Sequence, residues 1–301
     1  MPPISLILTF LSSVIHVGWN VLAKKNQPSA PLFLAGALVG GLCPLPILIY
    51  HLQKVPMILA DLWLFLLISG FATVFYYRSL ATAYNASNLS VAYPLLRSSP
   101  IFIVGIMFLL GKGYEISWQC LVGIILVIIG CFFLPMSNFK DFRKSNYISR
   151  TFLAALIAAT ATAIYSVSDD HSLRLLDSGK YGSLTNVEVS LIYSSLWGIS
   201  SCLWQSISIM VRKVERAVFL EIIQYKKRTI IPLGLGITLG YLLTLAAMTY
   251  SQNVAYVIAF RQVNIPLGAL LGVLVFKDSF PLPKATGLLI LFIGLTLVAT
   301  G

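Results

Sequence analysis

Charged side chains are scarce in this sequence. Asp, Glu, Lys and Arg make up 10% of its 301 residues, whereas an ordinary soluble domain is about one-quarter charged. A chain with so little charge cannot cover a water-exposed surface of its own size. The composition therefore argues against a soluble enzyme.

Cysteines and catalytic motifs are also few. The four cysteines all lie inside apolar segments and lack the spacing of metal ligands: Cys43, Cys120, Cys131 and Cys202. The sequence contains no HExxH motif, no Walker loop and no G-x-S-x-G elbow. We predict a protein that is not an enzyme, with no catalytic residue, no metal and no cofactor.

What the sequence does have is long apolar runs, since 58% of its residues are hydrophobic. A helix needs about 20 apolar residues to cross a hydrocarbon core of roughly 30 Å. The first run lacks a basic start and an A-x-A cleavage pattern, so we expect it to remain as a span. Ten such runs are expected, near residues 4–23, 31–50, 62–84, 87–110, 118–135, 151–171, 186–211, 229–251, 253–276 and 284–300. The expected fold is an all-α integral membrane protein of ten transmembrane helices, whose count depends on turns at Asn85 and Gln252.

The two halves of the chain resemble each other. An ungapped offset of 164 residues pairs Ser87 with Ser251, Arg97 with Arg261, Gly123 with Gly287 and Gly130 with Gly294. We predict one five-helix repeat over residues 1–135, a polar linker over 136–150 and a second repeat over 151–301. Because each repeat has an odd number of helices, the second enters the membrane inverted, with a binding site between the two near the midplane.

Basic residues outnumber acidic ones, 21 to 10. In a soluble protein this excess would suggest nucleic acid, but here most basic residues fall in short gaps between apolar runs. That pattern is typical of topology signals and contacts with lipid headgroups. The positive-inside rule places the gaps with most basic residues in the cytoplasm and both termini outside. We expect a multi-pass protein of the inner (plasma) membrane, monomeric or homodimeric, with the lipid bilayer as partner and no nucleic acid.

Two arginines inside the apolar runs are the sharpest candidates for a binding site. Arg97 and Arg261 each precede a proline by a few residues, and a buried guanidinium there can hold a carboxylate or a phosphate. The alternative is a permanent ion pair. Tyr93 lies close to Arg97 along the chain and is a further candidate. Arg78, nearer the end of its run, is expected to reach the membrane surface.

Polar residues also share one face of the first span. His16, Trp19 and Asn20 are three and four residues apart, so they point the same way. His16 can take up a proton near neutral pH and Trp19 can form a cavity wall. Hydrogen bonding between helices by His16 and Asn20 is an equally good interpretation.

The sixth span carries a second such face. Tyr165 and Asp169 are four residues apart, and Asp169 lies deeper in the span than Asp170. A carboxyl group at that depth can accept a proton or a cation. It can equally be the permanent partner of a buried arginine, while Asp170 and Arg174 are expected at the wetted helix end.

Together these residues resemble the EamA-type ten-helix members of the drug/metabolite transporter superfamily. The resemblance rests on HVGWN at 16–20, on YPLLRSSP at 93–100, on Tyr165 with Asp169 and Arg174, and on Arg261. It departs from the family's R-E-x-S pattern at two positions, which hold Gln262 and Asn264. It also implies a basket of inverted five-helix repeats that moves small organic metabolites, commonly outward and coupled to protons.

We therefore expect a secondary transporter, an exporter of small anionic or zwitterionic molecules of amino-acid-like or drug-like kind, coupled to protons. The expected substrate-binding residues are Arg97, Arg261, Tyr93, Trp19, Asn20, Tyr165, Gln262 and Asn264, and the expected proton-coupling residues are His16 and Asp169. Two alternatives are a flippase or lipid-carrier component for an amphiphilic or phosphorylated substrate, and a membrane enzyme or structural subunit.

Overall fold

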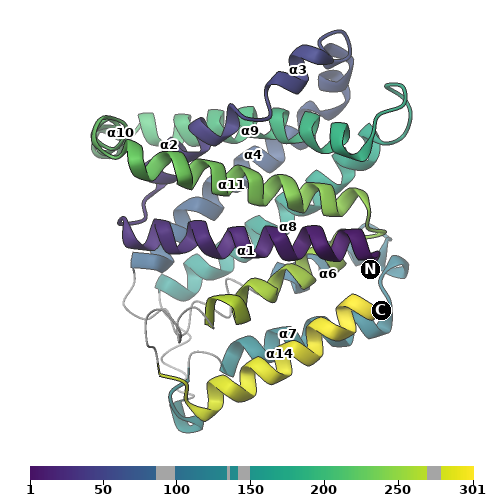
Figure 1. The fold of residues 1–301 in the computed structure, drawn as a ribbon, viewed down its shortest axis with the longest axis vertical. Coiled ribbons are helices and arrows are strands. Elements are labelled where there is room, and N and C mark those ends of the chain that lie inside the picture. The colour runs from purple at the N-terminus through teal and green to yellow at the C-terminus, as the bar shows by residue number, and fades with distance from the viewer. Residues whose placement is uncertain (86–98, 134–135, 142–149, 270–278) are drawn as a thin grey trace.

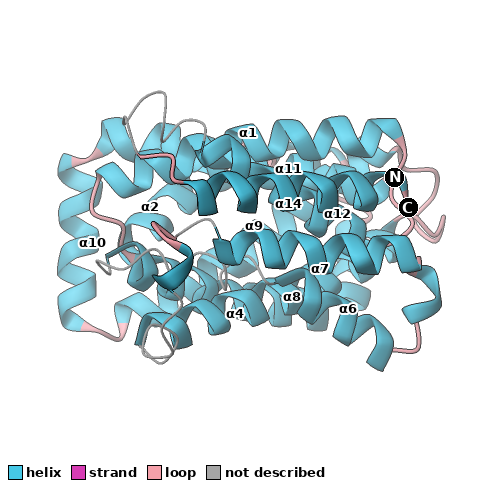
Figure 2. Cartoon of the chain, turned by 90° about the horizontal axis from the view of Figure 1, so that it is seen from below, coloured by secondary structure: helices cyan, strands magenta, loops and turns pink. Residues whose placement is uncertain are grey.

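The computed structural model describes residues 1–85, 99–133, 136–141, 150–269 and 279–301, and this part of the chain forms helices without any strand. Most of the helices lie side by side along one direction, and α10 runs across one end of them (Figures 1 and 2). The helices are α1 (Pro3–Lys25), α2 (Ala30–Gly41), α3 (Pro46–Tyr50), α4 (Val55–Asn85), α6 (Ser99–Leu109), α7 (Trp118–Phe133), α8 (Arg150–Leu176), α9 (Asn186–Met210), α10 (Lys213–Tyr225), α11 (Lys227–Thr249), α12 (Val254–Phe260) and α14 (Leu282–Thr300).

Local sequence signals explain where several helices begin. Ser29 caps α2 and Asn253 caps α12, each accepting a hydrogen bond from a backbone amide of the first turn. At α9, Thr185 and Glu188 form a reciprocal capping box. The cap at Asn253 follows the end of α11, so the expected turn near Gln252 is present and separates two helices.

The structure differs from the sequence prediction at two places. The run 31–50 is not one helix, because α2 ends at Gly41 and turns over residues 42–45 lead into the short α3. Two glycines followed by Pro44 and Pro46 weaken a helix there. The basic gap after α9 also contains an additional helix, α10.

The inner face of α1 is polar, whereas its outer face is apolar. Ser5 and Ser12 are fully buried and donate hydrogen bonds to the carbonyl oxygens of Ala247 (2.9 Å) and Gly240 (2.6 Å) on α11. Ile7, on the opposite face of α1, is 59% exposed. Small hydroxyl residues between helices and large apolar residues outside are typical of helices packed in lipid.

Four helices of the described part are long and apolar enough to cross a membrane: α1, α4 up to Thr82, α11 and α14. The apolar helices α2, α6 and α7 are shorter. Large apolar side chains remain exposed along many of these helices, which a water-soluble surface does not tolerate in such number.

Contacts between the two halves of the chain follow a reciprocal pattern. The first helix of each half packs against a long helix of the other half, α1 on α11 and α8 on α4. Helices α2 and α9, α6 and α12, and α7 and α14 pack on each other. In Figure 1, α7 and α14 form a pair at one edge of the molecule.

Glycines set the close approach of α7 and α14. A Cβ atom built on Gly123 would lie 2.7 Å from the carbonyl oxygen of Gly294, and one on Gly130 would lie 2.6 Å from that of Gly287. These are the four glycines that the 164-residue offset aligns, and they meet crosswise. Such reciprocal contact is what a two-fold relation between two similar surfaces produces.

Candidate functional site

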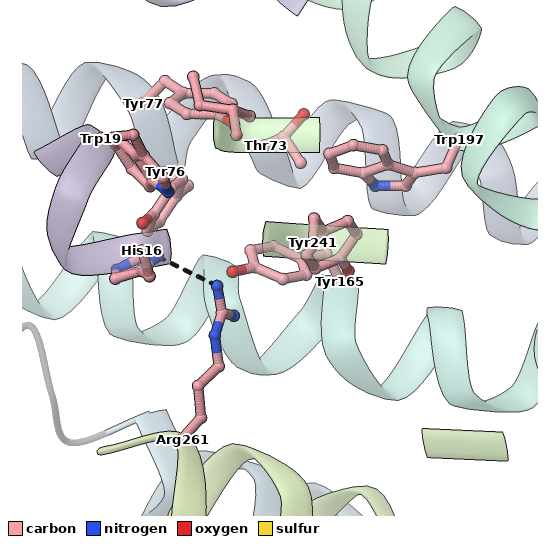
Figure 3. Close-up of a pocket in the computed structure, with 10 residues that line it drawn as sticks. His16, Trp19, Thr73, Tyr76, Tyr77, Tyr165, Trp197, Tyr241 and Arg261 are labelled. Atoms are coloured by element: carbon pink, nitrogen blue, oxygen red, sulfur yellow. Dashed lines mark hydrogen bonds between the residues drawn. The ribbon is translucent and has the colours of Figure 1, made fainter. Parts of the chain in front are cut away.

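A small pocket lies where α1, α4, α8, α9 and α11 meet the turn that follows α12 (Figure 3). Its lining combines aromatic rings with few polar groups: His16, Trp19, Thr73, Tyr76, Tyr77, Tyr165, Trp197, Ile237, Tyr241 and Arg261. The cavity measures about 20 Å³, which is room for about one water molecule. The structure therefore holds the pocket in a contracted form.

Arg261 is the cationic side chain among the described residues that line this pocket. It belongs to a 3-10 turn, Arg261–Val263, between α12 and helical residues 264–269. Pro266 has no amide to donate to the carbonyl of Gln262, which accounts for a break in the regular helix at this point. The turn directs the guanidinium toward α1, where Nη2 lies 3.2 Å from His16 Nδ1.

The contact with Arg261 defines the protonation state of His16. A guanidinium can only donate hydrogen bonds, so His16 Nδ1 must accept and the imidazole is neutral in this arrangement. A proton on Nδ1 would replace this hydrogen bond with two like charges at the same distance.

Aromatic rings form one continuous chain around the pocket. The neighbouring ring centroids are 4.4 to 6.3 Å apart along His16, Trp19, Phe33, Tyr77, Tyr76, Tyr165, Tyr241 and Trp197. Rings supply large apolar contact areas, and the faces of Trp and Tyr also attract cations. Among the described lining residues, these rings surround one guanidinium, that of Arg261.

Two hydrogen-bond donors of the pocket have no partner among the described residues. They are Nε of Arg261 and the indole Nε1 of Trp197, and both atoms are buried. Buried donors are normally paired, and each exception calls for a reason. A ligand acceptor in the pocket would satisfy them.

Asp169 lies behind the pocket rather than in it. It is fully buried and accepts hydrogen bonds from the hydroxyl groups of Ser69 (2.5 Å), Tyr193 (2.5 Å) and Tyr241. Arg261 is not among these hydrogen-bond partners, and Arg97, the other arginine considered as a partner, lies outside the described residues. Tyr241 also lines the pocket, and its hydroxyl connects the pocket to this carboxyl group.

The structure thus brings together four residues that the sequence nominated, His16, Trp19, Tyr165 and Arg261. Three others lie outside the lining. Asn20 donates to the backbone oxygen of His16, Gln262 donates to that of Ile258, and Asn264 is buried. Tyr93 and Arg97 lie outside the described residues.

Sequence reasoning missed part of the lining. Thr73, Tyr76 and Tyr77 lie three and four residues apart on α4, and Ile237 and Tyr241 lie four apart on α11. The same spacing that identified His16 and Trp19 was available for them. A tyrosine in the middle of a span, away from both interface belts, is the signal that marks Tyr241.

Two further ionic contacts lie away from the pocket. Arg78 makes a two-pronged pair with Glu215 of α10, at 2.8 and 2.6 Å, and donates to Ser208. Arg174 pairs with Asp170 at 2.9 Å and also donates to a backbone oxygen of the turn after α11. Both arginines therefore reach helix ends, as expected for side chains near a membrane surface.

A model of a known protein family matches the first part of the chain. Residues 3–136 match the model of the EamA-like transporter family. The resemblance to the drug/metabolite transporter superfamily is confirmed there. This EamA-like module runs from α1 to α7 and contributes His16, Trp19 and the α4 residues to the pocket. Together with the apolar helices, it makes the protein a multi-pass membrane protein.

The likeness in fold extends beyond the EamA-like module. A solved structure entitled "Crystal structure of protein" is 14% identical to this chain and superposes with a TM-score of 0.62. The match covers 98% of this chain and 97% of the other, so both halves share its fold. No curated protein matches the sequence.

Proposed function

We propose that this protein is a secondary transporter that carries a small organic anion or zwitterion through the pocket of Figure 3. One observation carries the proposal: the guanidinium of Arg261 lies among aromatic rings, with Nε buried and without a partner in the described residues. A carboxylate is the group that pairs best with such a donor set. The EamA-like module of the first half supports transport as the activity.

The proposed architecture is ten transmembrane helices in two inverted five-helix repeats, residues 1–135 and 151–301, joined by the linker 136–150. The reciprocal helix contacts and the crossed glycines of α7 and α14 support it. The pocket receives residues from both repeats, so a relative motion of the repeats would open it to one side and then the other.

His16 and Asp169 are the proposed proton-coupling residues. Among the described residues that line the pocket with His16, the charged or titratable groups are Arg261 and the tyrosines of the wall, and Tyr241 leads on to Asp169. Protonation of His16 would break its hydrogen bond with Arg261 and so couple the charge of the pocket to proton entry. Outward movement of substrate against entering protons is the proposed direction, in the plasma membrane.

Counterflow into liposomes that contain the purified protein tests the proposal. Arg261→Ala should abolish exchange of carboxylate-bearing substrates, and Arg261→Lys should retain part of it because the charge remains but the two-pronged geometry is lost. Arg212→Ala, which removes a 64% exposed arginine outside the pocket, is the control. Undiminished exchange of every carboxylate-bearing substrate by Arg261→Ala would refute the anion site.

A further inference from the structure

Helix α10 is set apart from the rest of the bundle by its direction. It joins α9 to α11 and runs across their ends, whereas its neighbours lie along the common axis (Figures 1 and 2). One face of it is docked on α2 and α9 through the buried side chains of Phe219 and Ile222. The remaining surface of α10 faces away from the protein.

The charge around α10 has one dominant sign. The segment 212–228 contains six basic residues, Arg212, Lys213, Arg216, Lys226, Lys227 and Arg228, and two acidic ones, Glu215 and Glu221. Glu215 is already paired with Arg78 and also meets Arg212. The exposed charge of this segment is therefore strongly positive.

Apolar residues lie directly beside that charge. Arg216, Leu220 and Ile223 follow one another at spacings of four and three residues, so they form one stripe next to the docked face. Leu220 is 60% exposed and Ile223 is 39% exposed. Exposure of these apolar side chains to water costs free energy unless something apolar covers them.

The position of α10 indicates what covers them. Helix α9 ends at Met210 and the apolar helix α11 begins at Lys227, so α10 lies where the bundle leaves the hydrocarbon layer. A helix with basic and apolar residues side by side, lying along that boundary, is the arrangement that binds anionic leaflets.

We infer that α10 is an interfacial helix that binds anionic phospholipid headgroups. Lys213 and Arg216 contact the phosphates, and Leu220 and Ile223 enter the upper acyl region. This proposal depends on the membrane location of the protein and is independent of its transport activity.

Native mass spectrometry of the full-length protein in detergent, titrated with phosphatidylglycerol or phosphatidylcholine, tests it. The double variant Lys213→Gln/Arg216→Gln should bind phosphatidylglycerol about thirtyfold more weakly, since each of the two basic residues near an anionic surface contributes about 1 kcal/mol. Lys54→Gln/Lys112→Gln loses the same charge outside α10 and should bind as the wild type does. Lys226→Gln/Lys227→Gln, changed at the end of α10, should repeat the loss.

Three results would overturn the inference. They are equal affinity of the wild type for the two lipids, unchanged phosphatidylglycerol binding by both α10 variants, and the same loss in the Lys54 and Lys112 control. Displacement of the lipid by an equal concentration of inorganic phosphate would also count against it, because the site would then be a simple anion site.

Discussion

Two of the tyrosines that donate hydrogen bonds to Asp169 can each be changed to phenylalanine, and the two changes have different expected effects on transport. Tyr241→Phe and Tyr193→Phe each remove one hydroxyl donor from the same buried carboxyl group. Both tyrosines are buried, but only Tyr241 lines the pocket. The two variants should therefore lose similar stability, whereas transport should fall further in Tyr241→Phe.

The loss of stability follows from the bond that is removed. A hydrogen bond to a charged group is worth about 1.5–3 kcal/mol. With an unfolding entropy of about 2.1 cal/mol/K per residue, 1 kcal/mol corresponds to roughly 1.6 °C for a chain of this length. Thermal unfolding of the purified variants should thus shift downward by about 2–5 °C.

The assays are thermal unfolding followed by circular dichroism, and counterflow in liposomes. In an Asp169→Asn background the further loss from either Tyr→Phe change should shrink, because the charged acceptor is gone. Equal transport by the two single variants would refute the idea that Tyr241 connects Asp169 to the pocket. A full-sized stability loss in the Asp169→Asn background would refute the shared acceptor.

Two further predictions concern packing and charge. Gly130→Ala should destabilise the protein by about 1–3 kcal/mol, since its Cβ would lie 2.6 Å from a backbone oxygen of α14. The control is Gly198→Ala, whose Cβ meets no atom within 4 Å and which should be neutral in thermal unfolding. Glu215→Gln should cost about 1 kcal/mol at pH 7. The guanidinium of Arg78 lowers the pKa of Glu215 below its usual 4.5, so this contribution is present at neutral pH and lost only as the pH falls below about 4.5. Unfolding midpoints of Glu215→Gln and wild type should converge in acid; a constant difference down to pH 3 would contradict the ion pair.

The sequence predicted most helices because apolar runs of sufficient length have few alternatives in lipid. It failed at α10, where the basic residues of segment 212–228 concealed an apolar face made by Val218, Phe219 and Ile222. That face is visible only as a spacing of three and four residues, since most of its surroundings are polar.

Four of the ten residues that line the candidate pocket were nominated from the sequence: His16, Trp19, Tyr165 and Arg261. His16 and Arg261 stood out because ionisable residues inside apolar runs are costly and thus informative. Tyr76, Tyr77 and Tyr241 did not, because tyrosine is ordinary in membrane proteins and its importance depends on which helix it faces. Which helix a tyrosine faces depends on the tertiary structure, and no local sequence pattern shows it.

The two kinds of helix contact in this protein indicate which parts should move. Helices α7 and α14 touch backbone to backbone at their glycines, and such contacts allow little sliding without a clash. The pocket helices α1 and α11 instead meet through serine and threonine hydroxyls, which can exchange one carbonyl acceptor for another. Because the pocket is contracted to about 20 Å³, a substrate can enter only if the helices around it separate. We therefore expect α7 and α14 to stay together while α1 and α11 shift against each other, and the 3-10 turn that carries Arg261 to move with them.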